Sequence, residues 1–439
     1  MAEIQPFCGI HYNPALVNDL GAVICPPYDI ITPQMQQELY QRSGYNFVRL
    51  EYGRKLPQDD DAENKYTRSL AILEQWLQQG ILIKDDKPAI YLHDHHFLYQ
   101  GEEKRRRGIT AVVRLEESGQ AAVRPHEGTM QEPKSDRLNL LWALQANTSS
   151  IFTLFTDTEQ QSVSSLLAAQ DQEKPLLELL VGDGGEGHRI WAITGAEVIK
   201  QICAYLADKP LYIADGHHRY ESALNYLKER RACSGGVSGE EPVNYVMMTL
   251  VELNDPGLII LPAHRLVRGI SGPVLGELMD KLEVFFNIEG LPLNISGVWP
   301  RVDRWLSEDT DSIKLVLFGL DREQLFLLKL HDLDAISKMM PYFHSEVYKR
   351  MDVSILDHII LEDLLGLRRD KEETSLGYSY DRLDAVNKIL EQEYQLTFLL
   401  SPVRTEVVKA IADAGDRMPR KSTYFYPKLP SGLICHRLV

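Results

Sequence analysis

A short apolar run, a glycine and a periodically apolar segment follow one another in "PLYIADGHHRYESALNYL", and this order constrains the fold more than any other feature. The apolar residues 211–213 predict a buried strand, which is followed by a break at Gly216. Beyond the glycine, apolar residues recur at i, i+3, i+4 and i+7 between Tyr220 and Leu227, which predicts one face of a helix. A strand that turns through a glycine directly into a helix favours an α/β architecture.

The polar residues of this turn are Asp215, Gly216, His217, His218 and Arg219. The first backbone N–H groups of a helix have no acceptor within the helix and can point at an anion. Gly216 lets a phosphate approach the backbone, Arg219 offers a planar pair of donors, and both histidines can donate to phosphate oxygens. Asp215 suits either a helix cap or a magnesium ion beside the phosphate. The turn therefore predicts a phosphate site, although a capped helix with surface histidines fits the same residues.

Strand-like and helix-like segments alternate along the rest of the chain, which predicts an α/β or α+β fold. The pattern restarts near residue 275, so we expect an N-terminal domain over 1–272 and a C-terminal α+β domain over 273–439 with an extended tail. The expected elements are helices near 33–43, 60–80, 196–207 and 275–286, strands near 187–194, 209–214 and 243–267, hairpins at 89–116 and 312–330, and helices from there to about 415.

The charge balance and the cysteines exclude several classes of protein. A net charge of −16 argues against nucleic-acid binding, and the basic run 104–107 is expected to form a charged hairpin tip. The chain has no apolar run long enough to span a membrane and no secretory signal at its start, so we expect it to be cytoplasmic. Five scattered cysteines without a CxxC pair argue against a disulfide framework and a structural zinc site.

Two further polar segments carry candidate functional residues. "RPHEGTMQEPKSDR" is dense in mixed charge and fixed by prolines, which favours a functional loop over a solvated loop before a helix starting near Ser135 or Asp136. We expect Glu127 to be the acceptor base or a metal ligand, with Asp29 as the next choice. "MPRKSTYFYPK" either closes over an anionic ligand or is an ordered tail anchored by its aromatic residues. The candidate phosphate or substrate contacts are Arg124, His126, Lys134, Arg137, Lys421, Ser422 and Thr423.

His93 and His95 share one face of a predicted strand and could bind a metal ion. No third ligand accompanies them in the sequence, so a solvent-facing strand is the preferred interpretation. His217 and His218 are also poor metal ligands for one ion, because adjacent helical side chains point about 100° apart.

Several segments resemble the domain-of-unknown-function 1015 family: "PPYDII", "RPHEGTMQEPKSDRLNLL", "PLYIADGHHRYESALNY", "DPGLIILPAHRLV" and "AGDRMPRKSTYFYPKLPSGL". The turn is also similar to the nucleotide motif of the ParB/sulfiredoxin-like superfamily, which includes free serine kinases, over about 187–267. This resemblance implies a ParB/sulfiredoxin-like mixed α/β core with an elaborated N-terminal part and a second α+β domain. His217 stands where sulfiredoxins have their catalytic cysteine, and His217 and His218 replace the middle of the Gly-Glu-Arg-Arg of ParB proteins.

The resemblance to free serine kinases implies a nucleotide-dependent kinase of a small hydroxyl metabolite such as serine, using ATP or ADP and magnesium. It implies phosphate binding by Gly216, His217, His218 and Arg219. We expect Asp215 to hold the metal, and Asp215, His217 and Glu127 to act in catalysis. A non-catalytic nucleotide-binding module and a metal-dependent hydrolase are the alternatives. Expected partners are a nucleotide and a small-molecule substrate but no membrane, and homo-oligomerisation is left open. The chain has no P-loop, Rossmann or α/β-hydrolase motif.

Overall fold

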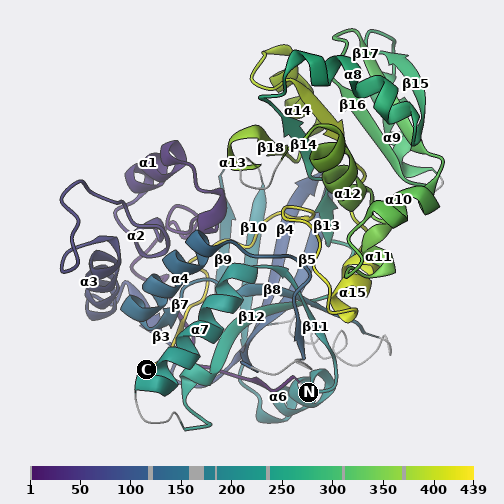
Figure 1. Ribbon diagram of the computed structural model, residues 1–439. Coiled ribbons are helices and arrows are strands. Elements are labelled where there is room, and N and C mark those ends of the chain that lie inside the picture. The colour runs from purple at the N-terminus through teal and green to yellow at the C-terminus, as the bar shows by residue number, and fades with distance from the viewer. Residues whose placement is uncertain are drawn as a thin grey trace. The chain divides into compact units, whose positions relative to one another are not determined.

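The computed structural model describes residues 2–116, 122–157, 173–182, 185–233, 238–308, 312–367 and 372–439 (Figure 1). The chain forms two compact units, both of mixed helix and strand, as the alternating sequence pattern predicts. Unit 1 comprises residues 1–125, 129–259 and 427–439, and unit 2 comprises 126–128 and 260–426. The C-terminal segment therefore belongs to the same unit as the N-terminus.

A mixed sheet forms the centre of unit 1. Its strands follow the order β6-β11-β8-β12-β5-β4-β10-β9, and β1 pairs with β5 beside this path. The pairs β12–β8 and β11–β6 are parallel, and the other neighbouring pairs are antiparallel. The strand bounds are β1 Ile4–Gln5, β4 Ile90–Tyr99, β5 Glu102–Arg114, β6 Val123–Arg124, β8 Ile151–Phe155, β9 Leu177–Val181, β10 Glu186–Ile193, β11 Leu211–Asp215 and β12 Tyr245–Glu252.

The predicted hairpin at 89–116 is confirmed as β4 and β5, but its basic run is not at the tip. Gln100 and Gly101 form the turn, with φ angles of 52° and 81°. Two positive φ angles in a two-residue loop match the twist of the flanking strands. Residues 104–107 therefore lie within β5, where alternate side chains point to opposite faces. Arg106 is buried on one face, and Arg107 pairs with Asp94 through two 2.6 Å contacts.

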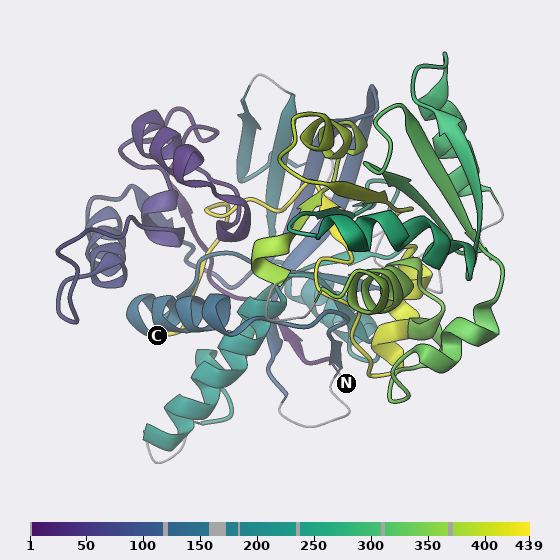
Figure 2. The same ribbon diagram turned by 45° about the horizontal axis from the view of Figure 1, so that its top comes forward.

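Three helices cover one face of this sheet: α4 (Gln131–Leu144), α6 (Ala196–Leu206) and α7 (His217–Cys233). Their apolar side chains form one core with Leu92, Ile109 and other residues of the sheet, and α4 and α7 lie side by side (Figures 1 and 2). The opposite face packs against the C-terminal segment, whose Leu433 and Ile434 contact a second core. Alternation along the strands thus gives the sheet two buried faces.

Helix α4 begins earlier than the sequence indicates. It starts at Gln131 with Met130 at the N-cap, not near Ser135 or Asp136. Pro133 lies in the first turn, where its missing N–H has no helical partner to lose. Pro133 is therefore part of the first turn of α4, and not part of the loop before the helix.

Most of the remaining elements of unit 1 pack beside the sheet around a separate apolar core. The predicted helix at 60–80 is confirmed as α3 (Lys65–Gln78), which begins at a capping box made by Asn64 and Thr67. The other elements are β2 Ile10–Tyr12, η1 Tyr28–Ile30, α1 Pro33–Arg42, α2 Val48–Glu51, β3 Leu82–Lys84, β7 Ala146–Asn147, η3 Pro242–Asn244 and β21 His436–Arg437.

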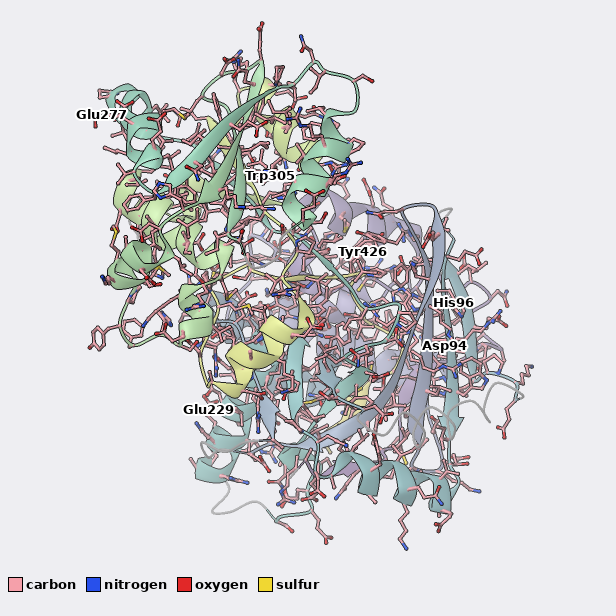
Figure 3. All side chains as sticks on the ribbon, turned by 90° about the vertical axis from the view of Figure 1, so that its right-hand side faces the viewer. Asp94, His96, Glu229, Glu277, Trp305 and Tyr426 are labelled. Atoms are coloured by element: carbon pink, nitrogen blue, oxygen red, sulfur yellow. The ribbon has the colours of Figure 1, made fainter. Side chains whose placement is uncertain are left out.

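Unit 2 is built on an antiparallel sheet in the order β15-β17-β16-β19-β14-β18. Helices α9 and α14 pack on it, and Figure 3 marks Trp305 on α9 and Glu277 on α8. Strands β18 and β19 interrupt the region expected to be helical up to 415. Element bounds are β13 Ile259–Leu261, β14 His264–Val267, α8 Gly272–Glu283, β15 Phe286–Pro292, α9 Val298–Ser307, β16 Lys314–Phe318, β17 Gln324–Leu330, α10 Leu333–Met339, α11 Glu346–Lys349, α12 Asp352–Ile355, η4 Leu356–Leu364, α13 Glu372–Ser375, β18 Leu376–Ser379, α14 Arg382–Leu390, β19 Leu396–Leu399, α15 Thr405–Asp413 and β20 Tyr424–Tyr426.

None of the helices in the described part of the chain is both long enough and apolar enough to cross a membrane.

Replacing Leu227 with alanine tests how strongly α7 depends on the sheet. Leu227 is fully buried in the core under α7, so the truncation leaves a cavity. We expect the free energy of unfolding of unit 1 to fall by about 3 kcal/mol, measured by chemical denaturation. Leu180→Ala is the matched control, because Leu180 is 71% exposed and its loss should cost little. Equal effects of the two variants would contradict this packing.

Candidate functional site

The turn between β11 and α7 is shaped by Gly216. Its φ of 95° is strained for any residue with a side chain. A Cβ atom at this position would also lie 2.9 Å from Nε of Arg219. Glycine therefore allows both the turn and the folding of Arg219 back over it, so that strand, turn and guanidinium form one compact group.

Asp215 binds two cations, one at each carboxylate oxygen. Lys428, from the C-terminal segment of unit 1, pairs with Oδ1, and Arg219 Nη2 donates to Oδ2 at 2.7 Å. Burial acts to raise the pKa of the Asp215 carboxyl, but the charges of Lys428 and Arg219 outweigh it and hold the pKa well below its usual value. One negative and two positive charges leave a net positive charge at the start of α7.

Arg219 is fixed from a second direction as well. Its Nη1 donates to the carbonyl oxygen of Ser150 at 2.6 Å. Its Nε is buried and has no hydrogen-bond partner among the described residues. A buried donor without an acceptor is costly, and an anionic ligand would satisfy it.

Arg106 is a further buried cation on the sheet face that the C-terminal segment covers. Its Nη2 donates to the carbonyl oxygen of Pro427 at 2.7 Å, and its guanidinium lies 4.8 Å from the centre of the Phe152 ring. Pro427 directly precedes Lys428, so Arg106 holds the residue next to the lysine that pairs with Asp215. Arg106 is not predicted from the sequence as a site residue, because a run of four basic residues is typical of an exposed turn.

The start of α4 lies against the first turns of α7. His218 Nε2 accepts a hydrogen bond from the backbone N–H of Met130 at 2.9 Å. Lys134 and Thr129 both bind the Glu221 carboxylate, at 3.0 and 2.6 Å. The structure thus brings residues 129–134 of the predicted functional loop to the helix that carries the turn, and these contacts fix the imidazole of His218.

Arg137 is buried in a polar network below this contact. Its guanidinium donates to Glu51 and Asp136 and lies 4.0 Å from the centre of the Tyr28 ring. A cavity of about 40 Å³ separates Arg137 from Arg219 and is also lined by polar residues of the 147–149 segment. A space of this size holds a few water molecules, not a nucleotide.

The other predicted residues divide between the two units. His217 is buried at the first position of α7, Arg124 lies on β6 opposite Tyr212 of β11, and Asp29 is exposed in η1. The residues in unit 2 bind to one another instead: His126 Nε2 lies 3.1 Å from Thr423 Oγ1, Lys421 N–H donates to Glu127 Oε1 at 3.1 Å, and Ser422 Oγ donates to the Pro419 carbonyl oxygen.

Replacing Asp215 with asparagine tests whether the two ion pairs stabilise unit 1. Because the native pKa is lowered, the carboxylate contributes stability above the ordinary aspartate pKa of about 4. That contribution is lost as the pH falls through the lowered native pKa. We therefore expect the melting-temperature difference between wild type and D215N to be largest near neutral pH and to shrink below pH ~4. A difference that stays constant with pH would contradict the ion pairs.

Comparison with known proteins gives the family of this chain and several weakly similar solved structures. Among curated proteins, none matches this chain. Similar solved structures include a conserved hypothetical protein from Pyrococcus furiosus (14% identity, TM-score 0.35, covering 75% of this chain and 95% of that one). Free serine kinase in complex with AMP has 11% identity and a TM-score of 0.37, covering 74% and 92%, and SbnI with a C-terminal truncation from Staphylococcus aureus has 10% and 0.34, covering 73% and 85%.

These similarities are too weak to carry an inference about binding or catalysis. The family model, in contrast, matches residues 4–354, which is most of the chain. This chain therefore belongs to the family described as "Protein of unknown function (DUF1015)".

Proposed function

We propose that this chain is a nucleotide-dependent kinase of a small hydroxyl metabolite such as serine, and that the phosphates of ATP or ADP bind at the start of α7. The net positive charge around Asp215 carries this proposal. It stands at a helix N-terminus, where the helix dipole adds to it, in a chain of net charge −16. A protein this acidic repels anions over most of its surface, so a local reversal of sign is suited to a specific anion.

Within this proposal the turn residues have distinct roles. Gly216 leaves room at the backbone, His217 and His218 donate hydrogen bonds to phosphate oxygens, and Arg219 offers its unsatisfied Nε. Asp215 positions Arg219 and Lys428 from either side. Since both carboxylate oxygens already face a cation, Asp215 suits this positioning role better than the role of a magnesium ligand.

Glu127 is proposed as the base that accepts the proton of the acceptor hydroxyl. Phosphoryl transfer requires a positioned group of this kind, and a carboxylate that keeps one oxygen on a backbone N–H is held in a defined orientation. The remaining candidates for substrate and phosphate contacts are Arg124, His126, Lys134, Arg137, Lys421, Ser422 and Thr423.

Arg219→Ala tests the nucleotide site. The variant removes a charged donor to the phosphates, so the Kd for ATP or ADP should rise by about ten- to a hundredfold, measured by isothermal titration calorimetry. Lys228→Ala is the matched control, because it removes one positive charge from an exposed position of the same helix and should leave the Kd almost unchanged. Absence of nucleotide binding by the wild type, with folding checked by circular dichroism, would refute the proposal.

Glu127→Gln tests catalysis separately from binding. Glutamine keeps an acceptor oxygen for the Lys421 N–H but cannot take a proton, so kcat should fall by about a hundredfold or more while the nucleotide Kd is retained. Phosphoryl transfer to serine and other small hydroxyl compounds is the assay, and Glu132→Gln, at an exposed position of α4, is the control. A wild type that binds nucleotide but phosphorylates none of these acceptors would instead support the non-catalytic module.

A further inference from the structure

Strands β4 and β10 place four ionisable side chains together on the sheet face opposite the helices. His93 and His95 lie on β4, and Glu186 and His188 lie on the adjacent strand β10, where His188 pairs directly with His95. The three histidines are between 1% and 5% exposed. The expectation of a solvent-facing strand is therefore wrong at these positions. Further candidate ligands, which the sequence did not indicate, come from the adjacent strand β10.

The distances within this group suit a metal ion. Glu186 Oε1 lies 2.7 Å from His95 Nε2 and 3.6 Å from His188 Nε2. One ligand atom from each of these residues can be chosen so that all lie within 4.8 Å of one another. Ligand atoms about 2.05 Å from a tetrahedral zinc ion stand about 3.3 Å apart, so adjustments of roughly 1 Å or less would bring the three together.

His93 holds one of these ligands, His188, through the ring nitrogen that faces away from the group. His188 Nδ1 and His93 Nε2 are 3.0 Å apart and share one hydrogen, so one ring donates and the other accepts. When His188 is the donor, its Nε2 presents a lone pair to the group. That atom is buried and has no hydrogen-bond partner among the described residues. A histidine held in this way by a second residue is the usual arrangement at metal centres.

We propose that His95, Glu186 and His188 bind a divalent transition metal of the zinc class. Two imidazoles and one carboxylate are the ligands that such ions take in proteins, with a further position open to water or substrate. Arg106 Nη2 donates to His95 Nδ1 at 3.0 Å, so the neutral ring carries its hydrogen on Nε2. When the metal binds Nε2, the hydrogen of the ring moves to Nδ1 and His95 stays a neutral imidazole, so Arg106 gives up this contact and keeps its hydrogen bond to the Pro427 carbonyl oxygen.

The opposite face of β4 supplies a matched control. Asp94 and His96, both labelled in Figure 3, alternate with His93 and His95 along the strand. Asp94 is bound by Arg107, and both Asp94 and His96 lie outside the proposed ligand set of His95, Glu186 and His188. His96→Ala removes an imidazole from the same strand without touching the three ligands.

The experiment is a titration of the metal-stripped full chain with Co²⁺ and with Zn²⁺, without nucleotide. Wild type and His96→Ala should bind one equivalent, and Co²⁺ should give visible absorption bands of a low-coordinate site that Zn²⁺ abolishes. His188→Ala and Glu186→Gln should lose those bands and weaken Zn²⁺ binding at least tenfold by calorimetry. Glu186→Gln preserves the shape of the side chain, so it provides the result if His188→Ala does not fold.

Absence of the bands in the wild type would overturn the proposal whatever the variants do. Bands that persist unchanged in a folded Glu186→Gln or His188→Ala protein would also overturn it, since the ion would then bind elsewhere. Because no readout involves nucleotide, failure here leaves the kinase proposal unaffected, and failure of nucleotide binding leaves this one unaffected.

Discussion

The Asp215 carboxylate is the point on which the arrangement of unit 1 depends, because three separate segments meet there. Strand β11 supplies the carboxylate, the first turn of α7 supplies Arg219, and the C-terminal segment supplies Lys428. Burial alone would favour the protonated acid, and the charges of the two cations outweigh burial and keep the carboxylate ionised. The C-terminal segment, residues 427–439, is therefore held in unit 1 by this ion pair as well as by the apolar packing of Leu433 and Ile434.

The face of the sheet beneath the C-terminal segment is polar along much of its width. Between Asp215 and the histidines of β4 lie Arg106 and the pair Thr110–Thr249, whose hydroxyls are 2.8 Å apart. Apolar side chains would fill such a buried layer at equal or lower free energy, because buried charges lose their hydration. Stability therefore does not explain this layer, and its cost is consistent with the two ligand sites proposed at its ends.

Local patterns predicted the elements of the fold, and long-range pairing determined the sites. The strand–turn–helix at Gly216 and the hairpin of β4 and β5 are determined by residues close together in sequence. In contrast, Lys428 meets Asp215 across 213 residues, and His95 meets Glu186 across 91. Periodicity shows that alternate residues of a strand share a face, but not which strand lies beside it.

The basic run 104–107 also depends on long-range pairing. The density of basic residues predicted an exposed tip, but the turn at Gln100 and Gly101 ends before this run begins. The run lies within β5, where neighbouring side chains point to opposite faces, so Arg106 is buried and Arg107 pairs with Asp94. The local sequence does not show which of the two arginines is buried, because that depends on the segments that lie beside β5. The carboxylate that binds Arg107 comes from β4, whereas the carbonyl oxygen that binds Arg106 comes from Pro427.

Arg106 lies between the two proposed sites. It donates to His95 on one side and to the Pro427 carbonyl oxygen on the other, and Pro427 is adjacent to the lysine that pairs with Asp215. Burial lowers the pKa of Arg106 to about 10, which leaves it charged at neutral pH. A cation at the histidines and an anion at the turn would act on this guanidinium with opposite sign, and buried charges are weakly screened. A change in charge at one end of the polar layer would therefore alter the electrostatic environment of the other end through the Arg106 side chain.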